Sequence, residues 1–192
     1  MNLNCRILLL LIATIAGCAD APPQDSRTLL DQNTGNTLVL VTHPLVFARE
    51  RSDVAAFARD YATLVAVEVD VTGSYKDYLL LYRWSTVDKR MSPLPAANTG
   101  ELHLEADGRV IILSALDQIP VSGTDLAALH YPRTADVVTH AYRVDAATLK
   151  FIAMSTRIVL RLPQEPFDSV FTLREDGRPS LAQFVRAEGV IQ

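Results

Sequence analysis

Alternation along residues 63–71 is the feature that most constrains the fold. Valines hold the odd positions from 65 to 71, while Leu64, Ala66, Glu68 and Asp70 hold the even ones. A period of two is typical of a β-strand, here with the valine face expected in the core. A Thr-Gly-Ser turn at 72–74 follows, and the aromatic segment 78–87 returns beside the first strand. These segments predict an antiparallel hairpin.

A second hairpin is predicted over residues 102–113, with its register. Asp107-Gly108 is a strong signal for a two-residue type I′ turn. If this turn forms, position i pairs with position 215 − i, and the alternation then agrees with the turn. One face would carry Leu102, Leu104, Ile111 and Leu113, and the other His103, Glu105, Val110 and Ile112.

The remaining elements predict a mainly β fold. Further strands are expected at 38–41, 45–49, 137–144, 157–162 and 169–174. Short helices are expected at 54–61, at 126–130, at 146–151 behind Asp145, and behind a capping box that opens at Ser180. Ten-residue helices between the strands are missing, which argues against a parallel α/β sheet. The expected fold class is an antiparallel β-sandwich-like domain or open barrel with a few short helices.

The first eighteen residues combine a positive charge, a short apolar run and small residues at the end of that run. Arg6 precedes the apolar run 7–15, which is typical of a secretory signal peptide and short for a membrane span. The run ends in Ile15-Ala16-Gly17-Cys18, which resembles the lipobox of bacterial lipoproteins. In that family the cysteine is diacylated, becomes the new N-terminus and is acylated again, so the resemblance implies lipid attachment at Cys18.

The resemblance also implies a cellular location and a division of the chain into three segments. Residues 1–17 would be the signal peptide, 18–36 a lipidated tether, and 37–192 a single β-rich periplasmic domain. Three acyl chains hold a protein at a membrane essentially permanently. In lipoproteins of double-membrane bacteria, Asp directly after the cysteine usually means inner-membrane retention. Ala19 stands there, so the resemblance favours the periplasmic face of the outer membrane over the inner membrane.

Composition excludes several classes of site and partner. Cys5 would leave with the signal peptide and Cys18 would carry lipid, so the mature chain would have no thiol for a disulfide, a metal or redox chemistry. Removal of Arg6 leaves 17 basic against 22 acidic residues, a net charge of about −5. The basic residues are scattered, which argues against a nucleic-acid partner. No cofactor is expected apart from the covalent lipid on Cys18.

Short motifs in the middle of the chain carry a second resemblance. Residues 44–49 (PLVFAR), 58–61 (ARDY), 67–69 (VEV) and 84–88 (WSTVD) are similar to pieces of a group of proteobacterial lipoproteins of unknown function. The resemblance spans roughly residues 29–90. It supports the lipoprotein assignment and implies no activity.

Two groups of side chains are candidate binding residues. Tyr78, Tyr82 and Trp84 share one parity on their strand, so they form either an exposed face that binds a glycan, another small ligand or a protein, or a layer of the core. His103 and Glu105 share a hairpin face and could supply two metal ligands, but a metal site needs three converging ligands and the sequence shows at most two, which favours a polar solvent-facing stripe.

No catalytic motif is evident. The sequence has no G-x-S-x-G elbow and no phosphate-binding glycine loop. The expected function is therefore a lipid-anchored, non-catalytic accessory or protein-interaction protein of the envelope. The alternatives are a small-ligand or glycan-binding module on the aromatic face and, third, a hydrolase.

Overall fold

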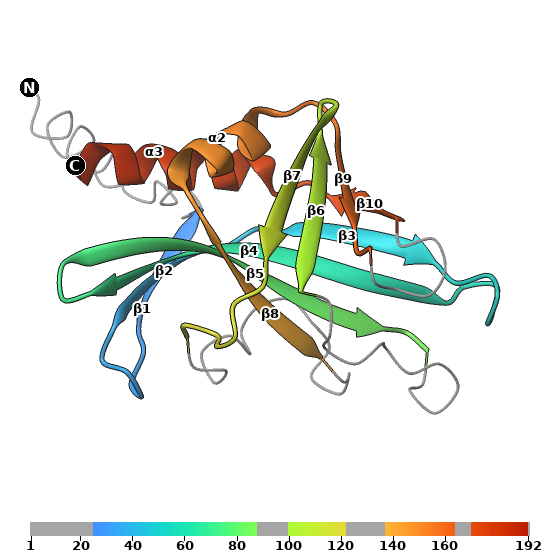
Figure 1. Cartoon of the computed structure of the whole chain (residues 1–192), viewed down its shortest axis with the longest axis horizontal. Helices are drawn as coiled ribbons and strands as arrows, with labels where there is room; N and C mark the ends of the chain where they lie inside the picture. Colours follow the sequence, from blue (N-terminus) through green and yellow to red (C-terminus); the bar gives the residue numbers. More distant parts are fainter. Residues whose placement is uncertain (1–24, 88–99, 122–136, 164–169, 192) are drawn as a thin grey trace, which may run out of the picture.

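The computed structural model describes residues 25–87, 100–121, 137–163 and 170–191 of the chain. Ten strands and two helices occupy them (Figure 1). The strands are β1 (Ser26–Leu30), β2 (Thr37–Val41), β3 (Leu45–Glu50), β4 (Arg59–Val71), β5 (Ser74–Ser85), β6 (Glu101–Ala106), β7 (Arg109–Ser114), β8 (Val138–Val144), β9 (Ile158–Arg161) and β10 (Val170–Glu175). The helices are α2 (Ala146–Met154) and α3 (Arg178–Ile191). This mainly antiparallel β architecture confirms the expected fold class.

One antiparallel sheet contains all ten strands, and its centre is the long hairpin β4–β5. The order along the main path is β1-β2-β4-β3-β10-β9-β6-β7, while β5 pairs with β4 on one side and with β8 on the other. Strand β4 is long enough to serve two neighbours along the same edge. Its first half pairs with β3 and its second half with β2.

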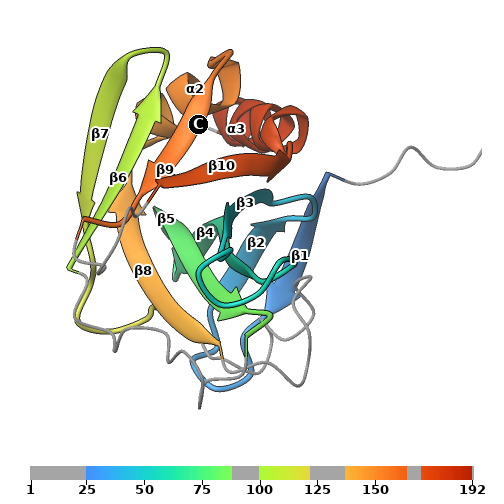
Figure 2. The same cartoon turned by 90° about the vertical axis from the view of Figure 1, so that its right-hand side faces the viewer.

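The sheet curls until its two ends nearly meet, which makes an open barrel. Beyond β7, Ala115 forms an isolated bridge to Tyr142 of β8, and the amide of Leu116 donates to the carbonyl of Ala141 at 2.8 Å. Figure 2 shows the curl from one end, with β6 and β7 opposite β2, β3 and β4. The interior is therefore enclosed by strands that lie far apart in the sequence.

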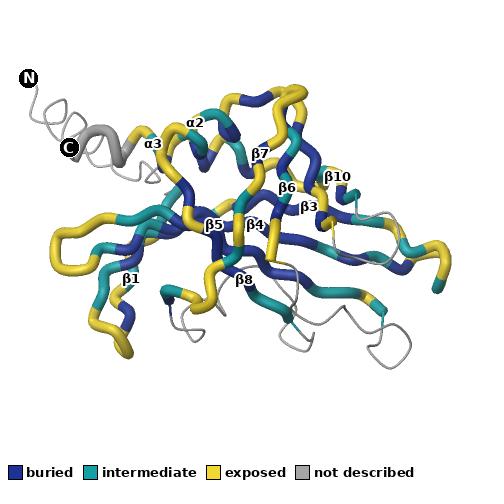
Figure 3. The backbone as a smooth tube through the Cα atoms, viewed as in Figure 1, coloured by how far each residue is buried: buried dark blue, intermediate teal, exposed yellow. Residues whose placement is uncertain are grey.

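Both faces of the central hairpin are buried. One cluster lies in the barrel interior and includes Phe47, Leu64, Leu81 and Phe171, and residues of α2 and α3 close it at one end. A second cluster on the opposite face contains Val65, Val67, Tyr78 and Tyr82 among others. In Figure 3 the middle of β4 and β5 is accordingly dark blue, and the connections at the strand ends are exposed. Burial of apolar surface on two faces accounts for a stable fold without covalent cross-links.

Both hairpin predictions are confirmed. Strand β6 pairs with β7 in the register expected from the turn, with Ala106 opposite Arg109 and Leu102 opposite Leu113. Asp107 and Gly108 have φ angles of 46° and 82°, as a type I′ turn requires. Strands β4 and β5 pair over their whole length around a turn at residues 72–73.

Three expectations are wrong. The segment 54–61 is a turn followed by the start of β4 and not a helix, because β-pairing places Asp60 in a buried ion pair. The even positions of β4 do not all face solvent, since Leu64 and Ala66 are each 2% exposed. The domain does not start at Thr37, because Ser26–Leu30 pairs with β2 as a strand within the segment expected to be a tether.

One of the two expected helix caps is confirmed. Asp145 caps α2 by accepting from the amide of Thr148 at 2.7 Å, as predicted. Helix α3 begins at Arg178, so Ser180 lies inside its first turn and does not open it. Within residues 25–87, 100–121, 137–163 and 170–191, no helix has the length and apolar character needed to span a membrane. The lipobox, Cys18 and the expected helix at 126–130 lie outside the described residues.

Candidate functional site

Polar side chains from four strands gather on the interior face of the barrel. Cross-strand pairing places Arg49 of β3 opposite Asp60 of β4, and Asp60 opposite Ser85 of β5. Two residues before Ser85, Arg83 faces the same side, and β8 brings His140 beside it. Sheet register alone therefore assembles a polar group next to the apolar interior cluster.

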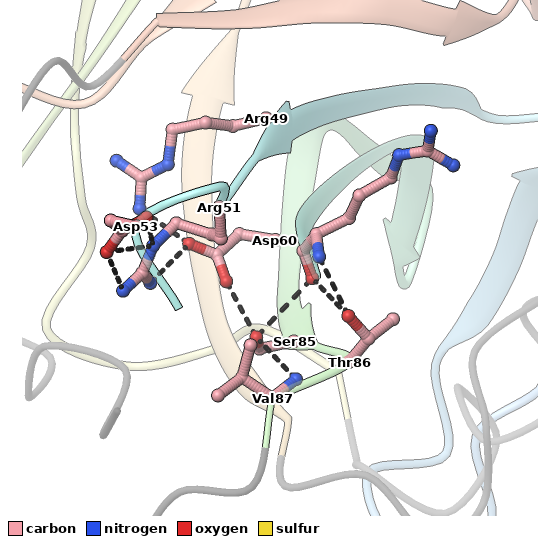
Figure 4. Close-up of polar contacts among 8 residues, drawn as sticks. Arg49, Arg51, Asp53, Asp60, Ser85, Thr86 and Val87 are labelled. Carbon is pink, nitrogen blue, oxygen red and sulfur yellow. Dashed lines mark hydrogen bonds and ion pairs between the residues drawn. The ribbon is translucent and has the colours of Figure 1, made fainter. Parts of the chain in front are cut away.

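Asp60 is the acidic centre of this group, and it is only 1% exposed. It accepts from Arg49 Nη2 at 2.6 Å, from Arg51 Nη1 at 3.1 Å and from Ser85 Oγ at 2.7 Å (Figure 4). Burial alone would raise the pKa of Asp60, but the hydrogen bonds from the hydroxyl and the two guanidinium groups outweigh burial and lower the pKa. The carboxylate stays ionised and is fully engaged in holding the strand ends together.

Arg51 braces the connection between β3 and β4. Its guanidinium bonds Asp53 through Nε at 2.9 Å and Nη2 at 3.0 Å, and it also reaches Asp60. These bonds raise the pKa of Arg51, with the contact to Asp53 as the main cause. A paired, bidentate arginine of this kind is a structural brace.

Arg83 differs from the other two arginines because burial dominates its surroundings. It is 1% exposed and the largest of the fully buried side chains. Burial and, to a smaller extent, the positive charge of Arg49 lower the pKa of Arg83 to about 10, with Asp60 opposing them in part. The cation is therefore held deep in the protein, where an additional anion or acceptor would stabilise it.

His140 and Tyr142 carry buried polar atoms beside Arg83. They are 8% and 0% exposed, their rings lie 6.5 Å apart, and both face the barrel interior. His140 Nε2 and Tyr142 Oη have no hydrogen-bond partner in the part of the chain that the structure describes. Buried polar atoms are nearly always hydrogen-bonded in native proteins, so two together mark a site of interest.

Electrostatics fix the protonation states of these two groups. Burial, followed by repulsion from Arg83, lowers the pKa of His140, so the imidazole is neutral at neutral pH. Burial raises the pKa of Tyr142 to about 12, and Arg83 offsets this only in part. The phenol is therefore a donor at any physiological pH. A neutral phenol, a neutral imidazole and a nearby cation favour an oxygen acceptor, such as a carboxylate or phosphate oxygen.

The aromatic row expected on β5 is not an exposed face. Tyr78 and Tyr82 are 8% and 1% exposed and belong to the second core cluster. Trp84 is half-buried and stacks on Tyr61 with ring centroids 4.1 Å apart. The structure therefore matches the core alternative for the two tyrosines, and a ligand cannot lie along this row.

His103 and Glu105 share a face as predicted, but each has its own partner. His103 Nε2 lies 3.1 Å from Glu101 Oε2, and Arg161 lies 3.4 Å from Glu105. Among the described residues, no group of three potential ligands converges on a point that could hold a metal ion. The pair is part of a polar outer stripe.

Ser180, His43 and Asp25 make the nearest approach to a hydrolase constellation. Ser180 Oγ donates to Asp25 Oδ1 at 2.8 Å and lies 3.3 Å from His43 Nδ1. A hydrolytic triad needs the serine proton directed at the imidazole and the carboxylate on its other nitrogen. Here the carboxylate accepts the hydrogen bond from the serine hydroxyl directly. Ser180 is also buried, at 4% exposed. This arrangement clamps the chain at Asp25 onto helix α3.

Sequence reasoning missed Arg83, His140 and Tyr142. One signal was present, because Arg83 interrupts the apolar segment between Tyr82 and Trp84. No protein-family model, no curated protein and no solved structure matches this chain. The assignment of function therefore rests on the geometry of the site.

Proposed function

We propose that this chain is a lipid-anchored, non-catalytic accessory protein of the bacterial envelope that binds a small acidic molecule inside its barrel. The lipid is carried by Cys18, and Ala19 after it favours the periplasmic face of the outer membrane. An oxygen acceptor of the ligand lies between His140 and Tyr142, beside the charge of Arg83. This interior position replaces the aromatic strand face considered above, whose tyrosines are buried.

A single observation carries the binding proposal. Two hydrogen-bonding atoms, His140 Nε2 and Tyr142 Oη, are buried without a partner among the described residues, on rings whose centroids lie 6.5 Å apart. Such atoms cost stability, and proteins retain them where a ligand or a reaction uses them. Neither atom bonds a hydroxyl or thiol among the described residues, which favours binding over catalysis.

Titration with small anions tests this proposal. The probes are acetate and inorganic phosphate, and isothermal calorimetry at constant ionic strength measures binding to the full-length protein. We expect saturable binding of at least one probe, weakened at least tenfold by Tyr142→Phe and by His140→Phe. Tyr75→Phe is the matched control because Tyr75 is 55% exposed on β5. No saturable binding, or equal binding by all variants, would overturn the proposal.

An envelope protein as partner is the second candidate, and the edge of the sheet favours it. Val110 and Ile112 of β7 are 55% and 57% exposed, and β7 ends the strand order. Apolar side chains on an edge strand are typical of strand-addition interfaces. Crosslinking in cells through a photoreactive residue at position 112 tests this candidate. A specific crosslinked protein supports it, and no crosslink above that of a photoreactive residue at position 75 refutes it.

A further inference from the structure

We propose that the connection between β3 and β4 contacts the bilayer surface that holds the lipid anchor, with Phe57 as the inserting side chain. The proposal rests on lipid attachment at Cys18 and adds a second point of contact with the membrane. Two contacts would fix the orientation of the domain relative to the membrane, which one point of attachment cannot do.

Phe57 is the most exposed large apolar side chain in the described part of the chain, at 88%. Ala55 and Ala56 before it are also exposed, and no charged residue lies between Asp53 and Arg59. The tip is therefore a short apolar segment with charges only at its base. Phenylalanine at the boundary between water and acyl chains is a common contact of membrane-associated proteins.

The loop is ordered by its own hydrogen bonds. The amide of Arg51 donates to the carbonyl of Ala58 at 2.8 Å, and the amide of Ala58 donates to the carbonyl of Ala55 at 3.0 Å. The side chain of Arg51 bonds both Asp53 and Asp60, which closes the base of the loop (Figure 4). Because the loop is already fixed, contact with a surface loses little conformational entropy.

The chain outside the described residues limits how far the domain can lie from the membrane. Cys18 precedes Asp25 by seven residues, which span about 25 Å at most when extended. Asp25 is fixed to the domain through Ser180 and through the amide of Thr42, which donates to its carbonyl at 2.9 Å. The lipid anchor therefore keeps the whole domain next to the bilayer.

The length of the linking segment also limits how the domain can be oriented when the loop touches the bilayer. Near Asp25, β2 pairs with β4 at Val67, eight residues from the start of β4 at Arg59. Eight strand residues span about 26 Å and the loop extends beyond them, so both contacts with the bilayer require the domain to lie along the surface and not end-on to it. The β3–β4 connection extends past that point at the right-hand end of Figure 1, away from α2. A lipid surface is the occupant that this tether supplies at high effective concentration.

Site-specific labelling tests the contact. The mature lipidated chain would have no other free thiol, so Ala56→Cys accepts a single fluorophore next to Phe57. The matched control is Met154→Cys on α2, since Met154 is 69% exposed and apolar. Both proteins are reconstituted into vesicles of phosphatidylethanolamine and phosphatidylglycerol that contain a doxyl-lipid quencher.

We expect at least threefold stronger lipid quenching at position 56 than at position 154, and loss of this difference on adding Phe57→Ser. Equal quenching at both positions, or a difference that survives Phe57→Ser, would overturn the proposal. The mass of the N-terminal peptide reports acylation separately. An unacylated Cys18 contradicts the anchor and this proposal with it, whereas an acylated chain with a water-exposed label contradicts the loop contact alone.

Discussion

Replacing Tyr142 with phenylalanine separates a binding site from an ordinary core position. The ring of Tyr142 is 0% exposed and packs in the interior cluster. Tyr142→Phe keeps the ring and removes only Oη, which has no hydrogen-bond partner in the described part of the chain. The variant therefore changes a buried polar atom without opening a cavity large enough to matter.

The expected sign is unusual, because most core substitutions destabilise. A buried polar group without a partner costs about 1–3 kcal/mol, and its removal returns part of that free energy. Attraction between the Tyr142 oxygen and the Arg83 cation, which partly opposes the rise that burial causes in the pKa of Tyr142, offsets some of the gain. We expect the free energy of unfolding without ligand to rise by about 1 kcal/mol, or the Tm by about 2–4 °C for a chain of this size.

Urea unfolding followed by the fluorescence of Trp84, the single tryptophan, measures this change. The midpoint should rise while the slope with denaturant stays constant, since the buried surface is the same. Tyr75→Phe, at an exposed hydroxyl, should leave the midpoint unchanged. A loss of about 1 kcal/mol or more in Tyr142→Phe would refute the reasoning, because it would show that Oη is already hydrogen-bonded within the protein.

Three further predictions concern the ion pair, a close contact and the anchor. Asp60→Asn should cost about 3–5 kcal/mol because it leaves buried guanidinium groups without their carboxylate, measured by urea unfolding. The lowered pKa of Asp60 means that its stabilisation is present above the usual carboxyl range and lost as the pH falls through its folded pKa. The variant should therefore lose less stability on acidification than the wild type, and an unchanged pH dependence would contradict this. Gly177→Ala should cost about 1–3 kcal/mol, since a Cβ there would clash with the His43 carbonyl oxygen. Gly100→Ala should be nearly neutral because nothing lies within 4 Å of the added Cβ; equal effects of the two substitutions on the free energy of unfolding would refute the close contact. Cys18→Ala should move the protein from the membrane fraction to the soluble fraction, and retention in the membrane would exclude lipid anchoring at this residue.

The hairpins could be predicted from the local sequence because the residues of each hairpin determine its turn and its register. Asp107 and Gly108 accept the positive φ angles of a type I′ turn, and the flanking alternation fixes the same register. Asp145 likewise caps α2 with its own side chain. Residues within about a dozen positions of one another determine these features, so the local sequence is sufficient to predict them.

Features that depend on the whole sheet escaped prediction. The helix expected at 54–61 does not form, because pairing between β3 and β4 is more favourable. This pairing gives Asp60 two guanidinium partners. The second buried face of β4 depends on strands that arrive much later in the chain. The helix cap expected at Ser180 was wrong because α3 begins at Arg178, and the Ser180 hydroxyl donates instead to Asp25, 155 residues away.

The interior site escaped prediction for a physical reason as well. Arg83, His140 and Tyr142 meet only because β5 and β8 pair across more than fifty residues. A polar residue in a strand normally faces solvent, so alternation alone assigns such residues to the outside. Curling of the sheet turns this face inward, and only the fold shows that these groups are buried.

The most direct test of the account observes His140 itself. Nitrogen-15 NMR of the imidazole, with acetate and inorganic phosphate as probes, follows the chemical shift of Nε2 as each anion is added at constant ionic strength and pH. The account predicts a saturable shift at His140 with at least one probe, absent from exposed His43 and lost in Tyr142→Phe. A His140 signal that neither anion moves, or one that moves equally in Tyr142→Phe, would contradict the claim that the barrel interior binds an acidic ligand.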